Sequence, residues 1–493
     1  MHGYPTVYLL LGLWVPFCLV AFATMRPQQA ALFALLGGVL ILPERRGFDI
    51  SGLPALGKLE LSSLGALLGC LVFQTRELIR GRAGAGLEVV LLLAIPFSLA
   101  TALTNRDPTG GAHYWFPGLR PYDAAGIIFR DLLLLGVPFV LGRTLFRTPE
   151  SLRLLLKGLI AAALAYSVLV LWEARMSPQL NQYLYGFGQH SFKQTRRFGG
   201  WRPMVFMAHG LALSVFLCAA MMAAIGAYRA KLKILRMPAG SVAVYLAVVL
   251  LLCRSLASIV YGAVAAPLLL VARPRIAGLA AAGIGMVVLT YPVLRSIDVF
   301  PTQTLIDSAA SVNELRANSL QTRFDYEDTL LDRARNRIWF GWGGFGRSRY
   351  TDDSARALVS DGYWILRLGE QGAAGLGLYF VLVLVPIFQA WRAIPRCPNR
   401  NDASLLATLS LILAIQALDT IPNALFNHIP LLMAGAVSGL AVTLPRQARK
   451  PKKVVESDAG SEPPSVPPPS APTLLELAKG KTRGANRRSG GLR

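Results

Sequence analysis

Apolar runs long enough to cross a membrane alternate with shorter polar segments along most of the chain. A bilayer core of about 30 Å requires roughly 20 apolar residues in a helix. The runs lack the strict apolar and polar alternation of barrel strands, and helices are the other structure that satisfies backbone polar groups in lipid. The pattern therefore predicts an all-α polytopic integral membrane protein with about twelve transmembrane helices.

The predicted spanning runs share high hydrophobicity and few charges. They are Pro5–Thr24, Gln28–Leu42, Leu87–Leu103, Ala124–Leu145, Leu152–Trp172, Met204–Tyr228, Val242–Cys253, Ile259–Val271, Ile276–Leu294, Gly372–Trp391, Leu405–Leu418 and Pro430–Leu444.

One further apolar run, Leu53–Phe73, is interrupted in its first half by Lys58 and Glu60. A crossing here would place the arginines that follow it on the opposite side from Arg45. Because Lys and Arg favour cytoplasmic loops, we interpret residues near 50–75 as a cytoplasmic amphipathic segment at the membrane interface. A transmembrane helix is the alternative.

Basic residues also set the expected orientation. Connections rich in Lys and Arg are predicted to be cytoplasmic, together with both chain ends. The segments near 105–122, 176–202, 295–370 and 420–429 are then external. The predicted domains are a first part of the transmembrane bundle (1–294), a large external loop (295–370), the last three helices (371–445) and a basic tail (446–493). The tail is rich in Pro and Ser and is expected to be disordered.

Composition supports the membrane class and narrows the possible partners. Of 493 residues, 54% are hydrophobic and 16% are charged. The net charge of +23 is spread over short loops and the tail, so nucleic acid is not an expected partner. The five cysteines are dispersed without metal-ligand spacing, and neither a disulfide nor a metal site is predicted. No cofactor is expected.

Unpaired arginines in external segments are the first candidates for chemistry. Residues 176–202 contain four Lys or Arg residues and no Asp or Glu, which is unusual for an external segment. Arginine binds phosphate oxygens through paired hydrogen bonds, so Arg197 and Arg202 indicate an anionic ligand. Attraction to anionic lipid headgroups is the alternative. Arg254 interrupts an apolar stretch near the external face, where a ligand role and a structural role both remain open.

The large polar loop adds a second group of candidates. Many of its charges follow the acidic-then-basic order that stabilises a helix dipole, but Arg323, Arg347, Arg349 and Asp361 are not explained in this way. Asp361 lies where the loop returns to the membrane. It is a candidate general base or, equally, the N-cap of the next helix.

Other polar residues favour structural interpretations. The adjacent Arg130 and Asp131 are expected to pair with neighbouring helices. His209 is expected to be a packed histidine, whereas His428 remains a candidate. Three glycines match a dinucleotide-loop spacing without the surrounding strand and helix, so they are expected to let the backbone turn. These glycines are Gly341, Gly343 and Gly346.

Four sequence motifs suggest a family. They are RRFGGWRPMVFMAHGLALS at Arg196–Ser214, LLCRSLAS at Leu251–Ser258, RFDYEDTLLDRARNRIWFGWGGFG at Arg323–Gly346 and SDGYWILRLGEQGAAGLGLY at Ser360–Tyr379. In their order and their placement in loops, the chain resembles the bacterial O-antigen polymerase and O-antigen ligase superfamily, which includes the Wzy-type polysaccharide polymerases. The resemblance covers roughly the central half of the chain.

The resemblance implies a membrane glycosyltransferase at the periplasmic face of the cell inner membrane. Its donor would be a sugar linked through diphosphate to a polyprenol. Arg202 and Arg323, with Arg197 or Arg347 as alternates, would bind the diphosphate, and the position of Arg254 adds it to this group. Fixed positive charge stabilises a departing diphosphate, so no metal is required. Asp361 would take the proton of the acceptor hydroxyl.

One departure from the family pattern favours a polymerase. Ligases of this kind have a histidine, often followed by asparagine, near the end of the large external loop, whereas this chain has Ser360, Asp361, Gly362 and Tyr363. An O-antigen ligase and a lipid-linked oligosaccharide flippase are the alternatives. The expected partners are polyprenyl-diphosphate-linked oligosaccharides, membrane lipid, and a chain-length regulator and flippase of the same pathway.

Overall fold

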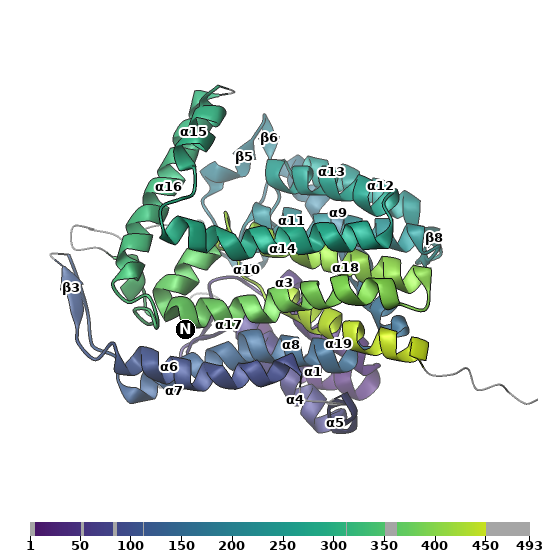
Figure 1. The fold of residues 1–493 in the computed structure, drawn as a ribbon, viewed down its shortest axis with the longest axis horizontal. Coiled ribbons are helices and arrows are strands. Elements are labelled where there is room, and N and C mark those ends of the chain that lie inside the picture. The colour runs from purple at the N-terminus through teal and green to yellow at the C-terminus, as the bar shows by residue number, and fades with distance from the viewer. Residues whose placement is uncertain are drawn as a thin grey trace, which may run out of the picture. The chain divides into compact units, whose positions relative to one another are not determined.

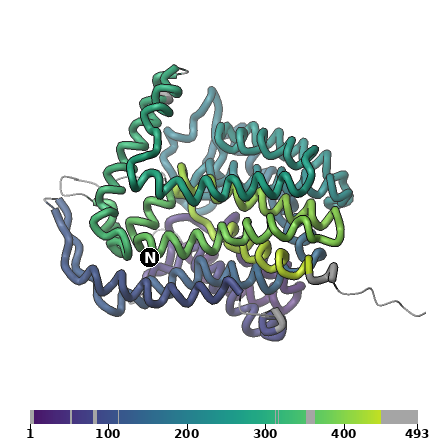
Figure 2. The backbone as a smooth tube through the Cα atoms, in the orientation of Figure 1, coloured from purple at the N-terminus to yellow at the C-terminus, as the bar shows by residue number. Residues whose placement is uncertain are grey.

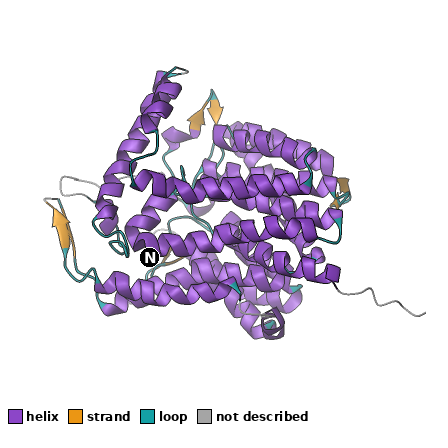
Figure 3. Cartoon of the chain, in the orientation of Figure 1, coloured by secondary structure: helices purple, strands orange, loops and turns teal. Residues whose placement is uncertain are grey.

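Helices dominate the computed structural model, which describes residues 5–50, 54–81, 86–111, 113–311, 313–350 and 362–449. Within these residues the strands form four two-stranded antiparallel hairpins (Figures 1 and 3). Seven described helices are long and apolar enough to cross a membrane, and five further apolar helices are shorter. The prediction of an all-α membrane protein is confirmed at this level. The tail from residue 450 onward lies outside the described residues.

The first half of the chain contains α1 to α9. The bounds are α1 (Pro5–Thr24), α2 (Pro27–Leu32), the π-helical turn η1 (Phe33–Gly37), α3 (Gly38–Ile41), α4 (Lys58–Phe73), α5 (Thr75–Gly81), the 3₁₀ segment η2 (Leu87–Leu93), α6 (Ala94–Leu103), α7 (Pro121–Asp131), the π-helical turn η3 (Leu132–Gly136), α8 (Val137–Leu145) and α9 (Pro149–Met176).

The second half contains α10 to α19. The bounds are α10 (Leu180–Tyr185), η4 (Phe192–Thr195), α11 (Gly210–Arg229), α12 (Ala239–Leu252), α13 (Leu256–Leu270), α14 (Pro274–Ser296), α15 (Thr302–Ala310), α16 (Glu314–Arg335), η5 (Arg347–Arg349), α17 (Tyr363–Ala393), η6 (Ile394–Arg396), α18 (Arg400–Asp419) and α19 (Ile429–Arg449). The hairpins are β1 (Gly47–Phe48) with β2 (Leu56–Gly57), β3 (Thr109–Gly111) with β4 (Tyr114–Phe116), β5 (Arg196–Arg197) with β6 (Gly200–Trp201), and β7 (Lys233–Ile234) with β8 (Met237–Pro238).

Helix α9 runs from one end of the bundle to the other. Its 28 residues, at about 1.5 Å each, give a length of about 42 Å. Before it, the carbonyl of Arg147 accepts a hydrogen bond from Thr443 of α19 at 2.6 Å, and we call this the tail end. After it comes the loop 177–209, where the carbonyl of Leu184 accepts a hydrogen bond from Thr6 of α1 at 3.3 Å. We call this the loop end.

The segments predicted to be external gather at the loop end. Asn105 donates a side-chain hydrogen bond to the carbonyl of Gly341 at 2.8 Å, which joins the segment after α6 to the large loop. The N–H of Tyr363 donates to the carbonyl of Thr420 at 2.9 Å, which joins the large loop to the α18–α19 connection. In the large loop, α15 and α16 form a helical hairpin (Figure 2). Which side of the membrane this end faces stays a prediction.

The start of the chain differs from the sequence-based expectation. Thr6 lies at the loop end and Thr443 at the tail end, so the described part of the chain begins and finishes at opposite ends of the bundle. The expectation placed both ends together. The difference arises in the segment between α3 and α5, where α4 adds one more helix along the length of the bundle.

Helix α4 packs along α1 and runs parallel to it. A Cβ atom added at Gly65 would lie 2.8 Å from the Sγ of Cys18, and one added at Gly69 would lie 2.4 Å from the Cδ2 of Phe22. Small residues allow this close approach between helices. The charge that argued against a bundle helix is paired, because Lys58 Nζ lies 2.7 Å from a Glu44 carboxylate oxygen. This packing does not fit an isolated interfacial segment at residues 50–75.

Helix α17 is broken at Gly372, which adopts φ +66° and ψ −169°. The N–H groups of Ala373 and Ala374 donate to carbonyls of residues 338 and 339 at 2.7 and 3.1 Å, and two N–H groups of the same loop segment donate back to carbonyls before the break. The large loop is thus inserted into the break. The three glycines of this segment have positive φ, which confirms the prediction that they allow the backbone to turn. They are Gly341, Gly343 and Gly346.

Helices α8 and α19 pack with backbone in contact, which generates a prediction. A Cβ at Gly142 would lie 2.1 Å from the carbonyl oxygen of Leu432, so Gly142→Ala must push the helices apart. We expect this overpacking to cost about 1–3 kcal/mol. Gly283→Ala is the matched control, because no atom lies within 4 Å of a Cβ there. Thermal unfolding in detergent should show a lower transition for the first variant only, and equal transitions would contradict the packing.

Candidate functional site

A buried carboxylate holds the loop 177–209 in place. Glu173 lies in the last turn of α9 and is 0% exposed. One of its oxygens accepts the N–H groups of Met204 and Val205, each at 2.8 Å, and the other accepts the N–H of Leu180 at 3.0 Å. Because buried backbone N–H groups need partners, these bonds fix both the beginning and the end of the loop.

The loop brings Arg197 and Arg202 to the connection between α12 and α13. Arg254, in that connection, has φ +53° and extends its guanidinium to the turn of the β5–β6 hairpin. It donates to the carbonyl of Arg197 at 3.2 Å and to the carbonyl of Phe198. Arg202 in turn donates from Nη2 to the carbonyl of Arg254 at 3.2 Å. A Cβ at Gly200 would lie 2.3 Å from the Arg254 guanidinium, so a larger residue there would displace that guanidinium.

Arg202 carries a positive charge that the described residues do not neutralise. Its side chain is 8% exposed, and its Nε has no hydrogen-bond partner among them. Burial, followed by the nearby charge of Arg197, lowers the pKa of the Arg202 guanidinium from its ordinary value. A buried cation with an unused donor is costly, so an anionic group at this position would stabilise the arrangement.

His209 lies within electrostatic range of Arg202, Arg197 and Arg323. Its Nδ1 accepts the N–H of Leu211 at 3.0 Å, which caps α11. Burial, then His190, and then the charges of three arginines lower the pKa of His209 to about 4. Hydrogen bonds link Arg202, Arg254 and the backbone of Arg197, and the charge of Arg323 reaches the same histidine. We call these four predicted diphosphate-binding residues the arginine cluster: Arg197, Arg202, Arg254 and Arg323.

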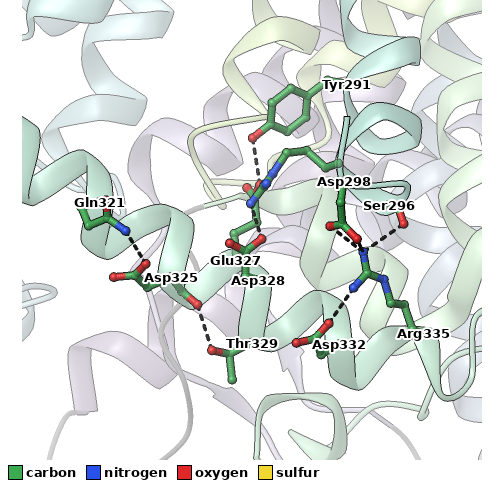
Figure 4. A network of polar contacts seen from close by, with 11 residues as sticks. Tyr291, Ser296, Asp298, Gln321, Asp325, Glu327, Asp328, Thr329, Asp332 and Arg335 are labelled. Carbon is green, nitrogen blue, oxygen red and sulfur yellow. Dashed lines mark hydrogen bonds and ion pairs between the residues drawn. The ribbon is translucent and has the colours of Figure 1, made fainter. Parts of the chain in front are cut away.

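Ion pairs join α14 to α16, the helix that carries Arg323 (Figure 4). Arg295 donates from Nε to Glu327 at 2.7 Å and from Nη2 to Asp328 at 2.5 Å. The hydroxyl of Tyr291 donates to the same Glu327 oxygen at 2.8 Å. Burial raises the pKa of Glu327, and the hydrogen bond from Arg295 opposes that rise. Arg323 precedes Glu327 by about one helical turn, so these bonds hold it near the bundle.

Arg347 does not join the arginine cluster. It is 1% exposed and donates to the carbonyls of Trp342 at 3.0 Å, Asp107 at 3.1 Å and Pro117. These bonds connect the large loop to the segment after α6. The structure therefore gives Arg347 a structural role in place of the predicted diphosphate contact. Asp361, the predicted proton acceptor, lies outside the described residues and stays a prediction.

The remaining candidates differ in the contacts that they make. Asp131 forms a paired ion bridge with Arg367, at 3.0 and 2.9 Å, which confirms the expected structural pairing for Asp131. Arg130 has no such partner within the described residues. His428 is 0% exposed with Nε2 3.0 Å from the carbonyl of Leu35, and this packing gives it a structural role.

A narrow apolar pocket begins beside the arginine cluster. Met207, two residues before His209, lines it together with Phe216, Tyr379 and Phe426, and its volume is about 40 Å³. Among the described residues, no group of three or more His, Cys, Asp or Glu side chains could hold a metal ion.

Glu173 and His190 were not among the residues predicted from the sequence. Glu173 directly follows the apolar run 152–172, and an acidic residue at that position was the available signal. His190 has no comparable signal, because only the folded loop brings its ring centroid to 4.5 Å from that of His209.

No model of a known protein family matches this chain, and no curated protein matches it.

The α14–α16 contact generates a prediction. Glu327→Gln removes one of the two carboxylates that bind Arg295 and should cost about 1.5–3 kcal/mol locally, the range for a hydrogen bond to a charged group, because Asp328 remains as a partner. Asp325→Asn is the control on the same helix, because Asp325 is exposed and bonds only Gln321 through its carboxylate. Hydrogen exchange of α16 amides should accelerate in Glu327→Gln alone. Unchanged exchange would show that the ion pair does not hold the part of α16 that carries Arg323.

The environment of His209 predicts a pH dependence. Its pKa falls from the ordinary 6.5 to about 4, so the unfolded chain binds more protons than the folded one between these values. Stability should therefore decrease as the pH falls from about 6.5 to about 4. His209→Asn keeps a capping acceptor but does not titrate, and it should reduce the loss of unfolding temperature at pH 5 by several degrees. Substitution of the exposed His113 by Asn should leave that loss unchanged.

Proposed function

We propose that this protein is a membrane glycosyltransferase that polymerises polyprenyl-diphosphate-linked oligosaccharide units into exopolysaccharide or O-antigen at the periplasmic face of the cell inner membrane. The observation that carries the proposal is the arginine cluster. Hydrogen bonds join Arg202 to Arg254 and Arg254 to the backbone at Arg197 at one end of the bundle, and the charges of Arg197 and Arg323 act on His209. The resemblance described above supplies the substrate class.

The chemistry requires stabilisation of a leaving diphosphate. An acceptor hydroxyl oxygen attacks the anomeric carbon of the donor sugar, and the bond from that carbon to the diphosphate oxygen breaks. The electron pair leaves with the diphosphate. Arg202 is suited to receive the developing charge, because it is buried, retains an unused Nε–H donor and interacts more strongly in a low-dielectric site. Arg197 and Arg323 would add positive charge around the same position.

The neutral imidazole of His209 is suited to donate a hydrogen bond to the substrate. Its Nδ1 accepts a backbone N–H, so the neutral ring carries its proton on Nε2 and can donate to a phosphate oxygen. With a pKa of about 4 the ring stays neutral at pH 7. The proton of the acceptor hydroxyl needs a separate base, and Asp361 remains the proposed one.

A ligase and a flippase would use the same basic surface, and a gene deletion separates them from a polymerase. Loss of a polymerase should leave single repeat units attached to the final lipid acceptor. Loss of a ligase should leave long chains that are not transferred, and loss of a flippase should leave neither product at the surface. Sizing the surface glycan on gels distinguishes these results, and glycan of normal length and attachment would end all three proposals.

Substitutions in the arginine cluster test the site itself. Arg202→Ala should lower polymer formation roughly a hundredfold, as expected when one donor to a developing negative charge is removed. Arg323→Ala should also lower polymer formation, but to a smaller extent, because Arg323 is exposed. Arg392→Ala, in the last turn of α17 at the tail end, is the matched control. Each variant must be quantified in the membrane fraction, and full activity in both cluster variants would exclude the cluster from the mechanism.

A further inference from the structure

A second polar pocket lies outside the arginine cluster, between α7, α17, η5 and the α18–α19 connection. Its volume is about 150 Å³, well below the roughly 300 Å³ at which pockets for drug-sized ligands begin. It therefore has room for one small group. Five charged side chains from the described part of the chain line it: Arg130, Asp131, Arg349, Arg367 and Glu370.

Two of these charges neutralise each other. Arg367 and Asp131 are 7% and 5% exposed and form two parallel hydrogen bonds at 3.0 and 2.9 Å. Paired geometry of this kind fixes both side chains, so the bridge forms a rigid wall between α7 and α17.

The other three charged side chains are available to a ligand. Arg130, Arg349 and Glu370 form no ion pair within the described residues. Glu60 of α4 interacts with the charge of Arg130 but does not line the pocket. Among the described lining residues, three arginines against two carboxylates give one net positive charge. Arg349 and Glu370 are partly buried and Arg130 is exposed, so all three can be reached by a ligand.

Aromatic side chains form the apolar part of the lining. Tyr363 and Phe426 both line the pocket, and their rings are stacked with centroids 5.1 Å apart and an interplanar angle of 20°. Tyr379 packs edge-on against Tyr363 at 5.1 Å and orients it. The C–H face of a sugar ring packs on such a surface, whereas an inorganic anion gains nothing from it. Phe426 also lines the narrow pocket that begins at Met207, so the two pockets share a wall.

We propose that this pocket binds one acidic monosaccharide unit through its carboxylate and its ring. Arg130 and Arg349 hold the carboxylate, Glu370 accepts hydrogen bonds from ring hydroxyls, and Tyr363 with Phe426 packs against the apolar face. A diphosphate fits less well, because Glu370 repels its additional charge. The assignment of this sugar to the glycan that is polymerised rests on the proposed function.

Ligand binding to the purified protein in nanodiscs tests the pocket directly. Saturation-transfer NMR should detect glucuronate and not glucose at the same concentration, and inorganic phosphate should compete weakly. Arg130→Gln and Arg349→Gln should each reduce the glucuronate signal at least about tenfold, the loss expected when a charged hydrogen bond of 1.5–3 kcal/mol is removed. Arg392→Gln should leave it unchanged. Equal binding of glucose, binding of phosphate without glucuronate, or no effect of either pocket substitution would overturn the proposal.

The arginine cluster provides the control that separates this inference from the proposed function. Arg202→Ala should keep the glucuronate signal even though it removes polymer. If glucuronate binds as expected but gene deletion leaves the glycan normal, the sugar site stands and the polymerase does not. If deletion abolishes polymerisation but glucuronate does not bind, the polymerase stands and this pocket assignment is wrong.

Discussion

At the loop end of the bundle parts of the chain are not helical, so their buried backbone N–H and C=O groups need hydrogen-bond partners from elsewhere. The structure of this end depends on those partners. Glu173 provides them for the loop 177–209, since its two oxygens accept three backbone N–H groups from both ends of that loop. Tyr166 accepts a fourth, from Phe206, at 3.0 Å. In a membrane protein irregular backbone persists only when it is satisfied in this way. The segment that carries Arg202 and His209 can therefore be held rigidly without being a helix.

Arginine serves two different purposes at this end of the molecule. Arg347, Arg367 and Arg295 use their donors on protein carbonyls or carboxylates, and each joins elements that are distant in sequence. Arg202 and Arg130 instead keep donors that no described protein group uses. The difference matters for function, because a guanidinium that already binds the protein contributes to rigidity, whereas one that retains free donors can bind a substrate anion.

The sequence indicated the fold class and the common location of the external segments because both follow from hydrophobicity and charge. It could not separate Arg347 from Arg323, since both are arginines in the same polar loop and only tertiary contacts distinguish them. It did not indicate the packing of α4 on α1, because Lys58 and Glu60 interrupt that apolar run, whereas the fold supplies Glu44 as the partner of Lys58. The polar pocket was also beyond prediction, because its side chains come from segments more than two hundred residues apart in the chain.

The insertion of the large loop into the break of α17 has a consequence for natural variation. The chain between residues 344 and 368 leaves and returns at two points that are tied to each other by hydrogen bonds around Gly372. Lengthening that excursion adds little entropic cost and leaves its two attachment points unmoved. Related proteins could thus acquire different surface specificities here by insertion, while the helices beneath keep one common framework.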